Sequence, residues 1–453
     1  MATTMRTLSK PSAISFWQAF RYWLKLGCIS FGGPPGQIAV MHQELVERRR
    51  WISERRFLHA LNYCMMLPGP EAQQLATYIG WLMHGVAGGI TAGTLFVLPS
   101  LFLLIALSWI YVRFGHAPVV AGVLYGIKPA VTAIVLFAAW RIGSRTLKNP
   151  WLITIAVAAF LTAFVLHLPF PYIVLTAGLL GALGGRLIPH AFDMHRAHSE
   201  GGTSSGTALI DDATPTSPHA VFSWRRLVIF VVVGLALWAG GLALCSAVSG
   251  WEGTYAQMGW FFTKAALLTF GGAYAVLPYV YQGAVEQHHW LTAVQMLDGL
   301  ALGETTPGPL IMIVAFVGFV GAWTQPAWGP ESLALAGAAG AGVATYFTFL
   351  PSFLFILIGA PLIEATHGDL KFTAPLTGIT AAVVGVIVNL AVFFAWRVLW
   401  PGGAVAAPFA GPFEWTAAAI GVAATIALFR FKVGVIPVIA ACGIAGLILP
   451  FSF

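Results

Sequence analysis

The sequence predicts an all-α polytopic membrane protein, and three observations support that prediction. Hydrophobic residues make up 58% of the 453 residues. Charged residues make up only 9%, against roughly 25% in soluble proteins, so a soluble globular chain and a disordered chain are both excluded. The apolar segments are continuous and long enough for membrane-spanning helices, without the alternation of a transmembrane β-strand.

The apolar segments form two groups of six, separated by one additional segment. The first group comprises residues 14–31, 57–83, 85–112, 119–143, 150–167 and 170–188. Residues 226–250 form the additional segment. The second group comprises residues 255–272, 293–322, 333–360, 373–399, 414–430 and 434–452.

The two groups repeat the same motifs in register, which predicts an internal duplication. KLGCISFGG at 25–33 matches KAALLTFGG at 264–272, an offset of 239 residues. At that same offset Pro68-Gly69-Pro70 matches Pro307-Gly308-Pro309. We expect four regions: a first repeat (1–192), a flexible hydrophilic cytoplasmic linker (193–225), a connecting transmembrane helix (226–250) and a second repeat (255–453).

The basic residues indicate that the second repeat is inverted in the membrane. The first repeat contains 15 Lys and Arg and the second only 5, with Arg397 on the side that the positive-inside rule disfavours. One additional crossing between two equal units gives them opposite orientations. We therefore expect a multi-pass protein of the cell (inner or plasma) membrane, with its N-terminus cytoplasmic and its C-terminus outside. Inverted repeats are typical of secondary transporters with a substrate site near the bilayer midplane.

Glycine and proline interrupt the first two segments of each repeat. If residues 14–31 crossed the membrane fully, the arginine-rich loop at 48–56 would lie outside. Pairs of half-helices that form re-entrant hairpins resolve this conflict, and we prefer them to thirteen full crossings, which remain the alternative. Interrupted backbone at membrane depth is tolerated where it is buried in protein or lines a polar cavity.

The interruptions predict an anion site near mid-membrane. A half-helix that begins there directs unpaired N–H groups and a positive dipole end at the break, while glycine permits close approach of a ligand to the backbone. The glycines of the four breaks are Gly32, Gly33, Gly69, Gly271, Gly272 and Gly308. We expect them to line the substrate site.

Two lysines occupy equivalent positions before the first break of each repeat. Lys25 and Lys264 each precede the first glycine by seven residues, and two symmetry-related ammonium groups suit a dianion. The alternative is that both side chains extend to the nearer membrane interface.

Acidic and neutral polar residues flank the second break of each repeat. Glu71 and Glu304 are candidates for proton coupling, and the alternative is that such a carboxylate caps a half-helix. Side chains that offer neutral hydrogen-bonding groups for the substrate are Gln73, Gln74, Thr305 and Thr306. The expected binding site comprises the six glycines, both lysines, Glu71 and these four residues.

We expect no metal site, no cofactor and no nucleic-acid partner. The four cysteines form no CxxC pair, and the net charge of +7 is assigned to cytoplasmic loops. No HExxH motif, paired-aspartate motif or credible Ser/His/Asp set is present, so the chain is not expected to be an enzyme.

Several of these motifs together resemble the chromate transporter family in its long, two-unit form. They are Ser30-Phe31-Gly32-Gly33-Pro34, Glu47 to Trp51, Leu67 to Leu75, Phe270-Gly271-Gly272 and Thr306 to Pro309. The resemblance covers nearly the whole chain apart from the linker. It implies export of chromate from the cytoplasm, and hence chromate resistance, with sulfate as a competitor, but it assigns no substrate-binding residues.

Three other functions stay open at this stage. A transporter of sulfate or another oxyanion would need nearly the same site, because tetrahedral dianions of similar size place similar demands on it. A channel and a membrane-embedded enzyme fit the pattern less well. Export by the membrane potential alone and export coupled to protons are both compatible with the sequence, as is a homodimer in the lipid bilayer.

Overall fold

The computed structural model describes residues 14–31, 33–192, 208–211, 219–366, 373–403, 407 and 409–449. These residues are mainly helical, and within them one isolated parallel bridge joins Ile52 to Ile210. Six of the described helices (α4, α5, α7, α9, α14 and α15) are long and apolar enough to cross a membrane. The prediction of an all-α, polytopic membrane protein is confirmed.

The first group of helices follows the expected segments closely. It comprises α1 (Phe16–Ile29), α2 (Gly33–His42), the π-helix η1 (Gln43–Arg48), α3 (Glu54–Met66), α4 (Glu71–Phe114), α5 (Pro118–Thr146), α6 (Pro150–Phe164), α7 (Phe170–Leu187) and the short α8 (Pro189–Phe192). The connecting helix α9 spans Trp224–Ser249.

The second group has corresponding elements in the same order. It comprises α10 (Thr254–Leu268), α11 (Ala273–Tyr281), the π-helix η3 (Gln282–Gln287), α12 (Ala293–Thr305), η4 (Leu310–Met312), α13 (Ile313–Thr324), η5 (Pro330–Ser332), α14 (Leu333–Thr366), α15 (Thr373–Leu399), α16 (Trp415–Phe429) and α17 (Val435–Ile448). Even the π-helices match, since η1 and η3 begin 239 residues apart.

The helices end at the glycine and proline positions that the sequence singles out. Residues 67–70 separate α3 from α4, and residues 306–309 separate α12 from η4. Gly69 has φ +125° and Gly308 has φ +99°. A side chain disfavours this conformation, so glycine is needed where the chain turns from one half-helix into the next.

In each group the first pair of half-helices folds back on itself. Trp51, beyond the second half-helix, contacts Tyr22 of α1 with ring centroids 5.3 Å apart. Trp290 contacts Phe261 of α10 in the same way, at 5.4 Å. A helix of ten residues such as α2 is about 15 Å long, half of the roughly 30 Å hydrocarbon core. The chain therefore reverses direction within each pair.

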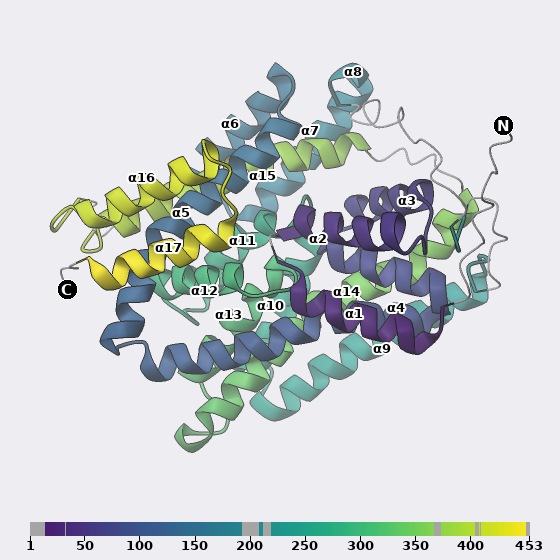
Figure 1. Cartoon of the computed structure of the whole chain (residues 1–453), viewed down its shortest axis with the longest axis horizontal. Helices are drawn as coiled ribbons and strands as arrows, with labels where there is room; N and C mark the ends of the chain where they lie inside the picture. Colours follow the sequence, from purple (N-terminus) through teal and green to yellow (C-terminus); the bar gives the residue numbers. More distant parts are fainter. Residues whose placement is uncertain are drawn as a thin grey trace, which may run out of the picture.

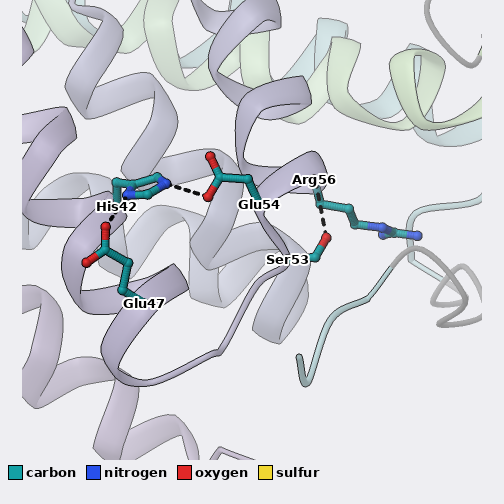
Figure 2. Close-up of polar contacts among 5 residues, drawn as sticks. All are labelled: His42, Glu47, Ser53, Glu54 and Arg56. Atoms are coloured by element: carbon teal, nitrogen blue, oxygen red, sulfur yellow. Dashed lines mark hydrogen bonds and ion pairs between the residues drawn. The ribbon is translucent and has the colours of Figure 1, made fainter. Parts of the chain in front are cut away.

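Polar contacts hold the turn between η1 and α3. Nδ1 of His42 lies 3.2 Å from Oε1 of Glu47, and its Nε2 lies 2.6 Å from Oε2 of Glu54 (Figure 2). Ser53 caps α3, because its hydroxyl accepts a hydrogen bond from the Arg56 N–H at 3.2 Å. These contacts join the end of one helix to the start of the next.

The breaks of the two groups bind each other reciprocally. The Gly69 N–H donates to the Thr269 carbonyl at 2.7 Å, and the Gly308 N–H donates to the Ser30 carbonyl at 2.7 Å. Thr269 follows Ser30 by 239 residues, as Gly308 follows Gly69. Such reciprocal pairing is the local signature of a two-fold relation. It places the breaks at the contact between the two groups.

The long helices of each group pack against helices of the other group. Helix α5 packs against α16 and α17, while α15 packs against α6 and α7. Helices α4 and α14 pack against each other. Figure 1 shows α16 and α17 toward the opposite end of the long axis from α3.

Part of the expected flexible linker is packed against the first group. The Leu209 N–H donates to the Arg50 carbonyl at 3.0 Å, and the Ser53 N–H donates to the Ile210 carbonyl at 3.0 Å. Ala208 is only 4% exposed. Residues 193–207 and 212–218 lie outside the described residues. Within the linker, residues 208–211 thus add a short extended segment to the turn before α3.

Candidate functional site

An open cavity of about 280 Å³ lies where three of the breaks approach α5 and α15. Its lining residues are Pro34, Pro35, Asn62, Met65, Met66, Glu71, Ala138, Arg141, Ile142, Arg145, Thr146, Gly271, Gly272, Ala273, Tyr274, Leu376, Thr377 and Thr380. Since a water molecule takes about 30 Å³ in the liquid, a tetrahedral oxyanion fits here with part of its hydration shell.

Two arginines give the cavity its positive charge. Arg141 and Arg145 lie one turn apart on the last part of α5, so both side chains reach the same wall. Arg141 is half-buried, whereas Arg145 is exposed at the mouth. Guanidinium groups present several N–H donors in a planar fork, the geometry that suits an oxyanion.

Two half-helices begin at the cavity wall. Helix α4 starts at Glu71 and α11 starts at Ala273, so the unpaired N–H groups of both first turns lie at the lining. Helix α2 contributes less, because its first turn contains Pro34 and Pro35, which have no N–H. The dipole ends of α4 and α11 add to the field of the two arginines.

Tyr274 separates the cavity from a buried carboxylate. Its ring lines the cavity, while its hydroxyl donates to Oε1 of Glu304 at 2.6 Å. Glu304 is 8% exposed and is not part of the lining. The Arg141 guanidinium is near enough to Glu304 to interact with it electrostatically. Glu304 thus lies behind the cavity wall, whereas Glu71 lies in it.

Apart from the two lysines, the structure divides the expected binding residues into three sets. The lining contains Glu71, Gly271 and Gly272. The residues in or next to the breaks but outside the lining are Gly33, Gly69, Gln73, Gln74, Thr305, Thr306 and Gly308. Gly32 lies outside the described residues.

Six of the seven residues outside the lining make hydrogen bonds within the protein. The Gly69 and Gly308 N–H groups are bonded to carbonyls of the other repeat, so they are not available to a substrate. Gln73 donates to the Thr77 hydroxyl at 3.0 Å, and Gln74 donates to the Pro68 carbonyl at 2.8 Å. The Thr305 and Thr306 hydroxyls donate to carbonyls of their own helix. In this conformation these groups stabilise the breaks.

The lysine pair is not brought together. Lys25 and Lys264 are both exposed on their helices, and neither lines the cavity. Nζ of Lys264 lies 5.9 Å from the ring centroid of Trp260, one turn earlier. The buried face of α1 is formed by Tyr22, Trp23 and Leu26, which turns Lys25 outward. Both lysines thus lie outside the cavity in this conformation.

Sequence reasoning missed the two arginines and the α15 threonines. In the sequence, Arg141 and Arg145 are two of the 15 basic residues of the first repeat and indicate only its cytoplasmic side. One signal was available: Phe137, Trp140 and Arg141 recur with the same spacing as Phe393, Trp396 and Arg397. Thr377 and Thr380 carry no comparable signal. Among the described residues, no group of three or more His, Cys, Asp or Glu is arranged to hold a metal ion.

Comparison with known proteins assigns the family. The model of the chromate transporter family matches residues 17–182 and 256–447, which correspond to the two groups of helices. No solved structure matches the chain.

The relatives extend over nearly the whole chain. A chromate transport protein of Pseudomonas aeruginosa is 34% identical over 98% of this chain and 95% of its own length. One from Cupriavidus metallidurans is 30% identical over 84% of this chain and 82% of its own. A probable chromate transport protein of Synechococcus elongatus is 30% identical over 84% of each. The chain therefore belongs to the chromate transporter family and is a multi-pass membrane protein.

Proposed function

We propose that this protein exports chromate from the cytoplasm and binds the dianion in the open cavity. The observation that carries the proposal is the convergence of Arg141, Arg145 and the N-termini of α4 and α11 on one cavity, in a chain of this family. Cationic side chains and half-helix N-termini together favour a divalent oxyanion over a neutral or cationic solute.

The proposed orientation places the cavity mouth at the cytoplasmic face. Arg145 and Lys148 lie at the end of α5, and the arginine-rich turn before α3 lies on the same side in a hairpin arrangement. The positive-inside rule favours the cytoplasm for both. If the two repeats are inverted relative to each other, the same breaks would also line a path from the site to the outside.

The membrane potential is a sufficient driving force in this proposal. A charge that crosses 100 mV gains about 2.3 kcal/mol, so a dianion gains about twice that on leaving a negative-inside cell. Glu71 provides a route to proton coupling, because its carboxylate would repel an anion in the same cavity whereas its protonated form would not. Replacing Glu71 with Gln removes that route.

The direct test measures transport in inside-out vesicles that contain the purified protein or overexpress it. We expect labelled chromate to accumulate when a potential, positive inside the vesicle, is imposed, and unlabelled sulfate to compete with it. Vesicles without the protein are the control. A lack of potential-stimulated accumulation would contradict export. If Glu71→Gln accumulates chromate but loses its dependence on a pH gradient, coupling passes through Glu71.

The proposed topology predicts which thiols can be labelled from outside. Arg48→Cys, at a side chain 63% exposed in the turn before α3, should resist a membrane-impermeant reagent in intact cells and react in inside-out vesicles. Glu252→Cys, between α9 and α10, is the matched control and should react in intact cells. Both variants are made after the four native cysteines are replaced by alanine. Labelling of Arg48→Cys from outside would rule out the cytoplasmic hairpin.

A further inference from the structure

We propose that the protein has a second oxyanion site, closed in this conformation, in which Lys128 and Arg397 are the cationic groups. It rests on the proposed function, because this site would receive the anion from the open cavity and release it on the other side of the membrane. Neither residue lines the open cavity.

The repeat relates the open cavity to a second set of residues. At the offset of 239, Met65 corresponds to Glu304. Further along the chain the offset is 252, because Leu98-Pro99-Ser100 matches Leu350-Pro351-Ser352. At that offset Lys128 corresponds to Thr380. Met65 and Thr380 line the open cavity. Their counterparts are ionisable and lie within the membrane-spanning part of the chain, where such groups mark substrate or proton pathways.

Arg397 is the counterpart of Arg141. Phe137 and Trp140 have ring centroids 5.7 Å apart, and Phe393 and Trp396 repeat that distance at 5.7 Å. The offset here is 256 residues, four more than for Lys128 and Thr380. Four residues make about one helical turn, so the arginine keeps its helix face and is displaced only along the axis.

Arg397 has no acidic partner among the residues that the structure describes. Its Nη1 donates to the Gly403 carbonyl at 2.9 Å, and its guanidinium carbon lies 4.6 Å from the ring centroid of Trp396. Its Nε is buried and has no hydrogen-bond partner among the described residues. An arginine on the side disfavoured by the positive-inside rule, with an unpaired buried donor, is suited to bind an anion.

Lys128 is held by a carboxylate that belongs to the other repeat. Its Nζ lies 3.5 Å from Oδ1 of Asp298, while the Tyr111 hydroxyl donates to Oδ2 at 2.9 Å. The Asp298 side chain is only 3% exposed, so this carboxylate lies inside the protein. The long ion pair leaves Oδ1 without a hydrogen bond from the described residues.

The Asp298 carboxylate therefore lies where a bound anion would contact Lys128. The Lys128 side chain is partly buried, at 26% exposure, so Asp298 or an anion beside it stabilises its charge. Separation of α12 from α5 would free Lys128, and an arriving dianion would replace the carboxylate. Tyr274 lines the open cavity and donates a hydrogen bond to Glu304, the repeat counterpart of the cavity residue Met65.

The first test separates binding from transport. In Lys128→Gln and Arg397→Gln we expect chromate export into inside-out vesicles to fall about tenfold or more, while chromate binding to the inward-open protein in detergent stays within about twofold of wild type. Arg113→Gln, which removes an exposed cation at the end of α4, is the control and should keep both. Lys128→Arg and Arg397→Lys should restore part of the export.

The proposal of a second site is wrong if both Gln variants export chromate at the wild-type rate. It is also wrong if they lose chromate binding and export in parallel. Failure of the proposed function is distinguishable, because then the wild-type protein itself would neither bind nor export chromate.

The first readout of the second test needs neither a substrate nor a lysine variant. Leu124, the repeat counterpart of the cavity residue Leu376, is replaced by Cys in the chain without native cysteines. We expect Asp298→Asn to raise its labelling by an impermeant reagent from outside about tenfold, because the ion pair that closes the site is lost. External sulfate should slow that labelling, and should not do so when Lys128→Gln is added. Unchanged labelling in Asp298→Asn would contradict the closed second site.

Discussion

Replacing Arg141 with Gln is expected to weaken chromate binding roughly 10- to 150-fold, because one charge-assisted hydrogen bond contributes about 1.5–3 kcal/mol. Arg141 is the half-buried cation of the open cavity, and its guanidinium lies beside the N-termini of two half-helices. Equilibrium binding to the purified protein measures the effect. Export should fall with it at chromate concentrations below the wild-type dissociation constant.

Lys148→Gln is the matched control for Arg141→Gln. Lys148 is an exposed cation just beyond the end of α5 and does not line the cavity. Its removal changes the net charge equally and should leave binding within about twofold of wild type, since exposed charges interact weakly through solvent. If the two variants bind chromate equally well, the cavity is not the binding site.

Replacing Gly69 with Ala is expected to destabilise the folded protein by about 2–4 kcal/mol. The residue has φ +125°, and an added Cβ would meet Nε2 of Gln74 at 2.7 Å and the Ser352 hydroxyl more closely still. Adjustment of the backbone would also weaken the hydrogen bond from the Gly69 N–H to Thr269. The loss is measured as a lower apparent Tm in detergent and a smaller monodisperse fraction after extraction.

The control for Gly69→Ala is Gly342→Ala. Gly342 lies inside α14, and a Cβ added there has no neighbouring atom within 4 Å. Alanine also favours a helix more than glycine does, so this variant should be as stable as wild type or slightly more stable. A Gly69→Ala protein with unchanged Tm would show that the break tolerates a side chain and that its glycine has another purpose.

The sequence predicts the breaks accurately because their cause is local. The Pro-Gly-Pro run removes two N–H donors and supplies a glycine with positive φ, so residues 67–70 and 306–309 are identified without knowledge of the tertiary structure. Single prolines such as Pro129 remain inside a helix. The duplication is equally visible, because motifs of the first repeat recur in the second at offsets of 239 and then 252 residues. Both features are properties of the chain alone.

The composition of the site is less accessible, because it depends on which helix face meets which neighbour. Lys25 lies near a break in sequence, yet Tyr22, Trp23 and Leu26 occupy the buried face of α1 and direct the lysine outward. That face was detectable from helical periodicity. Arg141 is remote from every break in sequence and reaches the cavity because α5 packs against α15, which also contacts α11.

The partner of Asp298 shows a further limit. Its ion pair with Lys128 joins residues 170 positions apart, from different repeats. No local pattern indicates such a pair, and the reciprocal packing of the repeats that brings it about is a tertiary feature.

The measurement that tests the account most directly is an anomalous difference map, recorded at the chromium absorption edge, of crystals grown with chromate. We expect one peak in the open cavity, next to the Arg141 guanidinium and the N-termini of α4 and α11. A second crystal form, in an outward-open conformation, should place the peak beside Lys128 and Arg397. A peak beside Lys25 or Lys264 with the cavity empty would contradict the account.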